Sequence, residues 1–199
     1  MRGEVSEAIP ALLRLLAAGL AAYLIGSFPT GVLLGRAWAG IDPRSVGSSH
    51  TGGLNVWRVT GRPWLAVLTM LVDAAKGIIA VVIGGRLALH PWALPVSGVM
   101  VTVGHCWPLY ARFRGGMGLS TLGVVFLFIQ PPLILAVAVL WFALYLATRH
   151  PARAMLLALP AVGPALWLVG EPGPVVALGL IGSLVLILRH VGDWRRGYE

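Results

Sequence analysis

The sequence predicts an all-α integral membrane protein: a polytopic bundle of seven transmembrane segments, with the N-terminus outside and the C-terminus in the cytoplasm. Of its 199 residues, 58% are hydrophobic and 11% are charged, and the mean hydropathy is +0.86. A soluble domain carries about 25% charged residues. The apolar residues also form long runs, and a spanning helix needs about 20 of them. This composition excludes an ordinary globular enzyme, a disordered chain and a conventional nucleic-acid-binding domain.

Seven apolar segments follow one another along the chain. In the first, residues 10–34, small residues such as Gly26, Ser27 and Gly31 allow a neighbouring helix to approach closely. A cleaved signal peptide is the alternative here, but the chain begins with an acidic stretch and the apolar run continues past the candidate cleavage site. The other segments are residues 64–84, 91–110, 119–129, 133–148, 154–169 and 175–188. No linker divides them, so residues 1–199 are expected to form a single transmembrane domain.

The fourth segment, residues 119–129, is too short to cross a bilayer as a straight helix. At 1.5 Å per residue its length is about 17 Å, against a hydrocarbon core of about 30 Å. It either continues through Pro131 and Pro132 into the fifth segment or forms a short, partly inserted helix. Basic residues distinguish these alternatives, because Lys and Arg concentrate in cytoplasmic loops.

Seven separate segments place most basic residues on one side of the membrane. The connections after segments one, three, five and seven hold eleven of the 15 Lys and Arg residues: Arg36, Arg44, Arg58, Arg62, Arg112, Arg114, Arg149, Arg153, Arg189, Arg195 and Arg196. Joining segments four and five would split this set between the two faces. We therefore predict that these loops are cytoplasmic, and that the net charge of +8 reports orientation rather than affinity for nucleic acid.

Two glycine-rich loops on this side have the composition of anion-binding loops. The first, residues 40–62, is rich in Gly, Ser and Thr and is expected to form no regular structure. It contains Asp42, Arg44, His50, Asn55 and Arg58. In the second, Gly115, Gly116 and Gly118 precede a helix expected to begin at Leu119. Glycine turns and helix N-termini present backbone N–H groups to phosphate, and Arg adds charged donors. The alternatives are a solvated loop that only sets topology and a glycine hinge.

The remaining ionisable residues indicate no metal site. The histidines on the cytoplasmic side are His50, His105 and His190, and their spacing matches no metal-ligand motif. Asp73 and Lys76 share one helix face, where they either pair with each other or take part in catalysis. The single cysteine, Cys106, excludes a disulfide framework and a paired-cysteine zinc module. We expect no metal.

Four ordered motifs run from about residue 21 to the end of the chain. The first comprises Gly26, Ser27, Pro29, Gly31, Arg36, Gly40, Asp42, Arg44, Val46, Gly47, Ser48, Gly52, Asn55 and Arg58. The second comprises Asp73, Lys76 and Gly77, and the third Gly104, His105, Pro108, Phe113, Gly115, Gly116 and Gly118. The fourth comprises Arg189, His190, Arg196, Gly197 and Glu199. Together they resemble the bacterial acyl-phosphate-dependent glycerol-3-phosphate acyltransferases of the PlsY type, of which this chain looks like a divergent member.

Four positions depart from the family pattern. His50 and Asp193 replace asparagines, Met117 replaces the lysine of a Gly-Gly-Lys-Gly turn, and Ala152 replaces a serine. The change to Met117 removes a cation from the expected phosphate site, and Arg112 or Arg114 is expected to compensate for it. The departures motivate an alternative: a non-catalytic or retasked relative that binds or transports a lipid or phosphate.

The resemblance implies transfer of a fatty acyl group from acyl phosphate to the 1-hydroxyl of glycerol 3-phosphate. The products are 1-acylglycerol 3-phosphate (lysophosphatidate) and phosphate, in phospholipid biosynthesis. It implies no cofactor, no nucleic acid, and partners limited to these substrates and membrane lipid, with the oligomeric state left open. It places the protein in the bacterial cytoplasmic membrane as a multi-pass protein, with the active site facing the cytoplasm.

The resemblance also assigns site residues by matched position. The catalytic residues are His190, Ser48 and Arg58. His190 orients or deprotonates the glycerol hydroxyl, with substrate phosphate as the alternative base. Ser48 and Arg58 bind phosphate. The further substrate- and phosphate-binding residues are Arg44, Gly47, Gly52, Asn55, His105, Arg114, Gly115, Gly116 and Gly118.

Overall fold

The structure, a computed structural model, describes residues 2–197, so Glu199 of the fourth motif lies outside the described residues. Within them, all regular elements are helices, which confirms the all-α prediction. The α-helices are α1 Arg2–Gly26, α2 Thr30–Ala39, α3 Gly53–Thr60, α4 Pro63–Ala88, α5 Ala93–Cys106, α6 Leu119–Ile129, α7 Pro131–Thr148, α8 Pro151–Ala158, α9 Val162–Leu168 and α10 Gly173–His190. Short 3₁₀ turns are η1 Leu109–Ala111, η2 Leu159–Ala161 and η3 Val191–Asp193.

Each of the seven predicted segments contains a helix. Of the described residues, five helical stretches are long and apolar enough to cross a membrane: Ala8–Ala39, Pro63–Ala88, Pro131–Thr148, Pro151–Leu168 and Gly173–Asp193. Two further helices, α5 with 14 residues and α6 with 11, are shorter than a bilayer-spanning helix. Apolar helices of this number and length make the chain a multi-pass membrane protein.

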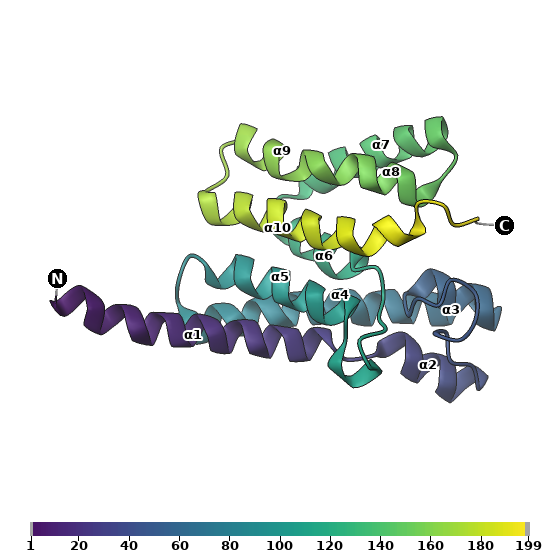
Figure 1. Ribbon diagram of the computed structural model, residues 1–199, viewed down its shortest axis with the longest axis horizontal. Coiled ribbons are helices and arrows are strands. Elements are labelled where there is room, and N and C mark those ends of the chain that lie inside the picture. Colours follow the sequence, from purple (N-terminus) through teal and green to yellow (C-terminus); the bar gives the residue numbers. More distant parts are fainter. Residues whose placement is uncertain (1, 198–199) are drawn as a thin grey trace.

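The first predicted segment is not one continuous helix. Residues 27–29 separate α1 from α2, and Pro29, which has no backbone N–H, precedes the first residue of α2. Ser27 is fully buried at this break, where its hydroxyl donates to the Tyr23 carbonyl and accepts from the Leu109 backbone N–H. The chain therefore changes direction here, and α2 lies at an angle to α1 (Figure 1).

The expectation that residues 40–62 form no regular structure is also wrong in part, because they contain helix α3. By contrast, the prediction that the fourth and fifth segments are separate helices is confirmed. Gln130 leaves helical geometry between α6 and α7, and Pro131 and Pro132 begin α7. The Gln130 side chain donates to Glu171, in the turn before α10, at 2.8 Å, which ties this break to the second half of the chain.

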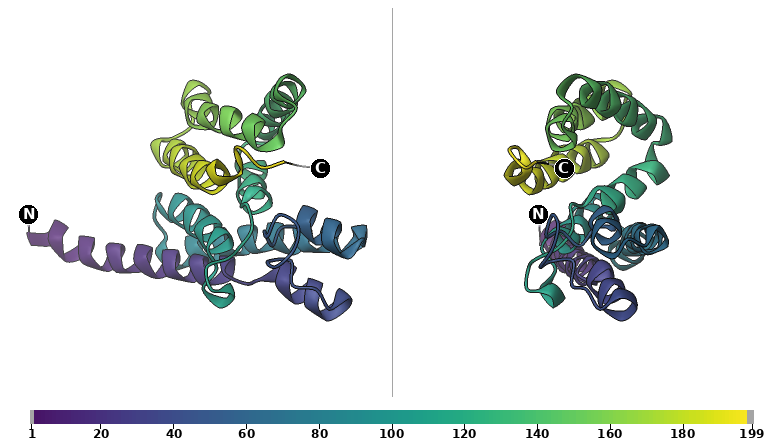
Figure 2. Two further views of the ribbon diagram at one scale, coloured as in Figure 1. Left: turned by 45° about the vertical axis from the view of Figure 1, so that its right-hand side comes forward. Right: turned by 90° about the vertical axis from the view of Figure 1, so that its right-hand side faces the viewer.

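The helices form two groups with α6 between them (Figures 1 and 2). In the first, α1, α4 and α5 pack closely through small residues such as Ala18, Ala22 and Ala80. The second contains α7, α8, α9 and α10. The main apolar core lies where α6 meets the second group and includes Phe126, Leu166 and Leu178. Helix α10 also packs on α5, which joins the groups.

The two glycine-rich loops and the C-terminal segment gather toward one end of the molecule. In Figure 1 the N-terminus lies at the opposite end from the C-terminus. The turns between α4 and α5 and between α9 and α10 lie toward the N-terminal end, whereas α2, α3 and the α7–α8 turn lie toward the C-terminal end. The packing thus brings together the loops in which the sequence concentrates its basic residues.

Candidate active site

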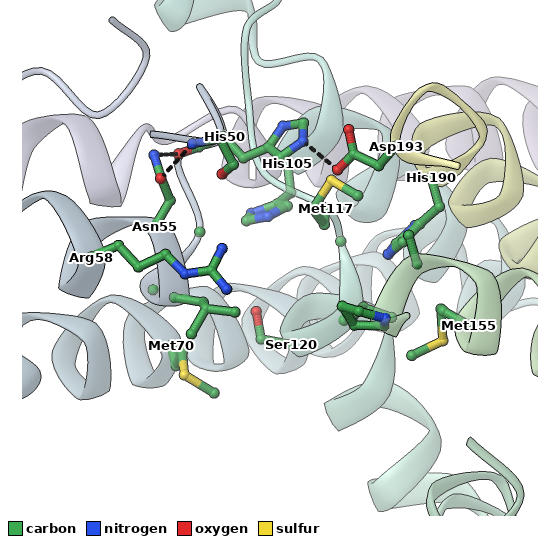
Figure 3. A pocket seen from close by; sticks show the side chains of 18 of the residues that line it. His50, Asn55, Arg58, Met70, His105, Met117, Ser120, Met155, His190 and Asp193 are labelled. Atoms are coloured by element: carbon green, nitrogen blue, oxygen red, sulfur yellow. Dashed lines mark hydrogen bonds and ion pairs between the residues drawn. The ribbon is translucent and has the colours of Figure 1, made fainter. Parts of the chain in front are cut away.

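A cavity of about 270 Å³ opens between the two helix groups, at the end where these loops meet. Seven of the predicted site residues line it: Ser48, Gly52, Asn55, Arg58, His105, Gly118 and His190. The four departed positions, His50, Met117, Ala152 and Asp193, line the same cavity. In Figure 3, Arg58 and His190 approach it from opposite sides, with His50 and Asp193 between them. Residues separated by more than 100 positions therefore form one site.

Asn55 organises the first glycine-rich loop. Its side chain is buried, accepts from the Ser48 backbone N–H at 2.9 Å, and donates to the carbonyls of Pro43 and His50 at 2.9 and 2.8 Å. Gly47 has a positive φ of 61°, and a Cβ there would collide with the Asn55 amide. The structure thus gives Asn55 a loop-holding role in addition to its place in the cavity wall.

The second glycine-rich loop packs on His105 and leads into α6. A Cβ on Gly116 would collide with the His105 ring, and Gly118 has a φ of 83° at the N-terminus of α6. Helix α6 begins at Leu119, as predicted, and its first N–H groups have no partner within the helix. Gly118, Leu119 and Ser120 line the cavity, so this helix terminus favours negative charge there.

Arg44, Gly47, Arg114, Gly115 and Gly116 are predicted site residues that are absent from the cavity lining. The Arg44 guanidinium instead pairs with Asp42 at 2.7 Å and donates to the Ala111 carbonyl at 2.9 Å. The Arg114 guanidinium donates to the Arg44 carbonyl at 2.9 Å. These two arginines brace the first loop against the second, because each is engaged by groups outside the cavity. The expectation that Arg114 covers for the missing lysine is therefore not supported by its position.

Asp42 holds the Arg44 side chain of this brace in place. Its carboxylate accepts from the Arg44 side chain and backbone and from Arg36. The hydrogen bonds from Arg44 hold the pKa of Asp42 well below its usual range. Asp42 is therefore ionised at neutral pH, and its charge offsets those of the two arginines that it contacts.

Asp73 and Lys76 pair with each other, which was one of the two alternatives for them. The Lys76 ammonium lies 2.9 Å from the Asp73 carboxylate, and both side chains are buried. The same carboxylate lies 3.5 Å from His105 Nδ1, and Lys76 also donates to the Phe28 carbonyl at 3.2 Å. Of these groups only His105 lines the cavity. The cluster orients that ring from behind the site.

The hydrogen bond of His190 determines which of its ring nitrogens can accept a proton. Its Nδ1 lies 2.8 Å from the Leu186 carbonyl, and a carbonyl only accepts, so Nδ1 carries the hydrogen. In the neutral ring Nε2 is then the acceptor, and His190 lines the cavity although its side chain is buried. This is the tautomer that a general base requires.

His50 differs from His190 because both of its ring nitrogens are engaged. Nε2 lies 3.0 Å from the Asp193 carboxylate, and Nδ1 lies 3.0 Å from the Arg189 guanidinium. Burial and the charge of Arg189 lower the pKa of His50, so the ring is neutral at neutral pH. The acceptor Asp193 and the donor Arg189 place its hydrogen on Nε2.

An apolar groove of about 400 Å³ adjoins the cavity on the side of α4 and α6. Met70, Leu119 and Ser120 line both, so the two spaces share a wall. The groove is otherwise lined by apolar side chains that include Leu71, Val124 and Leu127. A molecule with a polar head and a hydrocarbon tail fits this combination. Among the described residues no cluster of three or more His, Cys, Asp or Glu side chains is placed to hold a metal ion.

Arg189 and Arg196 contact the glycine-rich loops beside the cavity, and sequence reasoning assigned them no role. Arg189 donates to the carbonyls of Gly116 and Gly115 at 2.8 and 2.9 Å, and Arg196 pairs with Asp193 at 2.9 Å. Both belong to the fourth motif, and Arg189 directly precedes His190. Membership of this motif and the position of Arg189 beside His190 were the signals available in the sequence. The partners were not evident, because they lie more than 70 positions away or, for Asp193, at a position that departs from the motif.

Comparison with known sequences identifies similar proteins. The family model described as "Glycerol-3-phosphate acyltransferase" matches residues 16–199. A protein of that description from Rubrobacter xylanophilus is 39% identical over 171 residues, which cover 86% of this chain and 85% of the relative. Another, from Pseudomonas syringae pv. tomato, is 41% identical over 176 residues and covers 87% and 89% of the two chains.

Comparison with solved structures agrees with these similarities. The crystal structure of PlsY (YgiH), an integral membrane glycerol 3-phosphate acyltransferase, superimposes in its glycerol 3-phosphate form with a TM-score of 0.80 and 28% identity. The lysophosphatidic acid form of that protein gives a TM-score of 0.77 and 27% identity. Both superpositions cover 92% of this chain and 90% of the other.

Proposed function

The chain belongs to the glycerol-3-phosphate acyltransferase family, and we propose that it acylates the 1-hydroxyl of glycerol 3-phosphate with an acyl phosphate as the donor. The products are 1-acylglycerol 3-phosphate and inorganic phosphate. The relatives and solved structures described above all carry the acyltransferase description. They lend no support to the alternative of a non-catalytic lipid- or phosphate-binding protein.

The observation that carries this proposal is that a cavity lined by Arg58 and His190 adjoins an apolar groove. The cavity contains Arg58, the N-terminus of α6 and His190, which suit phosphate groups and a proton transfer. The groove suits the hydrocarbon chain of the donor. An acyl phosphate already has a good leaving group, so positioning and charge neutralisation can supply much of the rate enhancement.

In the proposed reaction His190 acts on the acceptor. The 1-hydroxyl oxygen of glycerol 3-phosphate attacks the acyl carbonyl carbon, and its proton passes to His190 Nε2. The bond between that carbon and the phosphate oxygen then breaks, and phosphate leaves with the electron pair. His190 returns the proton to solvent or to the departing phosphate. The donor phosphate itself is the alternative base, since its oxygens are also near the attacking hydroxyl.

Ser48 and Arg58 bind substrate phosphate in this proposal, together with Gly52 of the first loop. Both side chains line the cavity, and Asn55 holds the Ser48 backbone in place. An Arg guanidinium suits phosphate because it offers several N–H donors in a planar fork. The backbone N–H groups at Gly118 and the start of α6 are proposed to contact the second phosphate, where the family lysine is replaced by Met117.

We further propose seven membrane crossings, an external N-terminus and a cytoplasmic active site in a bacterial cytoplasmic membrane. Eleven of the 15 Lys and Arg residues lie in the four connections assigned to the cytoplasm. In this proposal the short helices α5 and α6 cross within the bundle, where α5 packs against the longer α1, α4 and α10 and α6 packs against the longer α4 and α7.

The experiment is an acyl-transfer assay on purified protein in liposomes. With palmitoyl phosphate and radiolabelled glycerol 3-phosphate, the expected product is lysophosphatidate. The variant His190→Ala is expected to lose at least about 100-fold in kcat, the range for removal of a general base. His90→Ala is the matched control, because His90 lies in the α4–α5 turn and caps the Trp92 N–H far from the cavity. Wild-type protein that makes no more product than His190→Ala would overturn the proposal, and a preference for acyl thioesters would overturn its donor.

A further inference from the structure

Two of the four positions that depart from the family pattern, His50 and Asp193, contact each other across 143 positions of sequence. We propose that this pair, together with Arg189, is a positioning device that holds the phosphate-binding loop against the helix that carries His190. The proposal rests on the proposed function, because only that function makes the first loop a phosphate-binding loop and His190 a base. The contacts themselves join residues of this chain, and they can be tested without the acyl-transfer reaction.

Three contacts join the first loop to the C-terminal segment. His50 Nε2–H donates to the Asp193 carboxylate at 3.0 Å, and Arg189 donates to His50 Nδ1 at 3.0 Å. Arg196 donates to the Ser48 carbonyl and pairs with the other oxygen of Asp193 at 2.9 Å. Ser48 and His190 are thereby held at a set separation, because the Ser48 carbonyl accepts from Arg196 and His190 directly follows Arg189.

Arg189 extends the network to the second loop. The same guanidinium that donates to His50 also donates to the carbonyls of Gly115 and Gly116 at 2.9 and 2.8 Å. One side chain thus joins both glycine-rich loops to the last turn of α10. The planar fork of an arginine is required for this arrangement, since a lysine ammonium is a compact point charge on a flexible stem.

His50 takes part as a neutral link and not as a base. Its Nδ1 lone pair accepts from Arg189 and its Nε2 hydrogen is donated to Asp193, so the neutral ring has no nitrogen left for a substrate proton. The side chains are well enclosed, with 13% of His50 and 5% of Asp193 exposed. Removal of His50 is costly because the enclosed Asp193 carboxylate then loses a hydrogen-bond donor.

The pair also explains how a carboxylate is tolerated in a cavity proposed to hold phosphates. The charge of Asp193 is offset by the Arg196 guanidinium and by the hydrogen bond from His50. Loss of the His50 hydrogen bond leaves more negative charge facing the phosphates. Conversion of both residues to asparagine removes the charge and the need for compensation at the same time. The two substitutions are therefore expected to be coupled.

The experiment is a double-mutant cycle with His50→Asn, Asp193→Asn and the double variant. His50→Asn is expected to weaken inhibition by inorganic phosphate at least 5-fold and to lower kcat/KM about 10-fold or more. Asp193→Asn lowers kcat/KM severalfold but does not weaken inhibition by phosphate. In the double variant both quantities return to within about 3-fold of the wild type, a coupling within the range known for contacting residues.

A double variant whose loss equals the product of the two single losses would overturn the proposal. So would unchanged phosphate inhibition in His50→Asn, since a purely structural role does not act through the charge of Asp193. Arg189→Lys provides a second, independent variant if His50→Asn fails to fold. Because lysine cannot make the three hydrogen bonds of the Arg189 fork, kcat is expected to fall at least 10-fold. Because lysine retains the positive charge, inhibition by phosphate is expected to change less than 2-fold. An unaltered kcat would contradict the proposal.

The proposed function and this inference fail in different ways. Isothermal titration calorimetry measures the binding of inorganic phosphate to the wild type and the same variants, and this measurement does not require turnover. Wild-type protein without acyltransferase activity would contradict the proposed function. Coupled effects of the His50 and Asp193 substitutions on phosphate binding would still support the network in that case. Full activity of the wild type, with additive effects of the two substitutions, would contradict the network but not the proposed function.

Discussion

At the scale of single residues, the hydrogen bonds of each histidine decide which task it can perform. His190 gives its Nδ1 hydrogen to a backbone carbonyl and keeps Nε2 as an acceptor. His50 uses both nitrogens within the protein, and His105 faces the buried Asp73 with one of them. The sequence places all three on the same side of the membrane but does not distinguish them. These contacts are the reason that the proposed proton transfer is given to His190.

Met117 offers the first residue-scale prediction. It lines the cavity at the position where the family has a lysine. Met117→Lys adds a cation near the proposed second phosphate, so the inhibition constant of inorganic phosphate is expected to fall about 3- to 10-fold, the effect of one added charge-assisted contact of about 1 kcal/mol. The measurement is product inhibition in the acyl-transfer assay.

Arg114→Ala tests whether that arginine already supplies the missing charge. Its guanidinium donates to the Arg44 carbonyl outside the cavity. The inhibition constant of inorganic phosphate is therefore expected to stay within about 2-fold of the wild type, because the lost hydrogen bond belongs to the loop brace. An increase of 10-fold would show that Arg114 reaches the phosphate and would refute the assignment made from its position.

Asp42 supplies a pH-dependent prediction. The pKa of its carboxyl is lowered in the folded protein, chiefly by hydrogen bonds from Arg44, below the usual 3.8. A lowered carboxyl pKa contributes stability above the usual value, and this contribution is lost as the pH falls through that value and below. Asp42→Asn is expected to lower the free energy of unfolding at pH 7 by up to about 1 kcal/mol, since solvent screens the partly exposed pair.

Thermal unfolding in detergent checks this prediction at two pH values. The difference in midpoint between the wild type and Asp42→Asn is expected to be largest at pH 7 and to shrink toward pH 3. A difference that is constant with pH would mean that the carboxylate charge is not what holds the two loops together.

At the scale of elements, small residues set how closely the helices of the first group pack. Two adjacent glycines of α4 show this directly. A Cβ on Gly84 would collide with the Ser97 side chain of α5, where the Ser97 Cβ lies 2.8 Å away, whereas a Cβ on Gly85 meets no atom within 4 Å. The two positions have the same chemistry and the same helix but different neighbours.

The matched pair Gly84→Ala and Gly85→Ala follows from this difference. Gly84→Ala is expected to destabilise the protein by about 1–3 kcal/mol, the usual effect of overpacking, because α4 and α5 must separate. Gly85→Ala is expected to be neutral or to stabilise by about 0.4–1 kcal/mol through the unfolded chain. Thermal unfolding in one detergent measures both, and equal effects would refute the close packing of α4 on α5.

At the scale of the whole molecule, the proposed orientation rests on the basic residues, most of which lie in loops at one end of the helices. The glycine-rich loops and the C-terminal segment lie toward one end, and the N-terminus lies at the other (Figure 1). The opposite orientation would place eleven of the 15 basic residues outside the cell.

Cysteine labelling tests this orientation. The native Cys106 is fully buried and is expected to stay unlabelled, so single cysteines can be added without a further change. Gly173→Cys, at the start of α10, is expected to react with a membrane-impermeant maleimide in intact cells. Arg195→Cys is expected to react only after the membrane is permeabilised. The reverse pattern would invert the protein.

The sequence by itself determined the class of the protein, the positions of its apolar segments and most of the residues around the cavity. These features are local: a run of apolar residues predicts a helix, Asp73 and Lys76 meet because they are three residues apart, and glycines before Leu119 predict the start of α6. The ordered motifs added His190, Ser48 and Arg58, all of which line the cavity.

Only the tertiary structure decided which side chains touch across the chain. Arg44 and Arg114 are chemically suited to bind phosphate, but each instead donates to a backbone carbonyl of the opposite glycine-rich loop. Arg189 contacts His50 and the second loop. The partners of His50 lie 139 and 143 positions away, on α10 and on the turn η3 that follows it, and the position of α10 depends on its packing against α5 and α9. Spacing along the sequence reports neighbours within one helix or turn. Contacts between distant segments depend on how whole helices fit together, and that fit is a property of the folded chain.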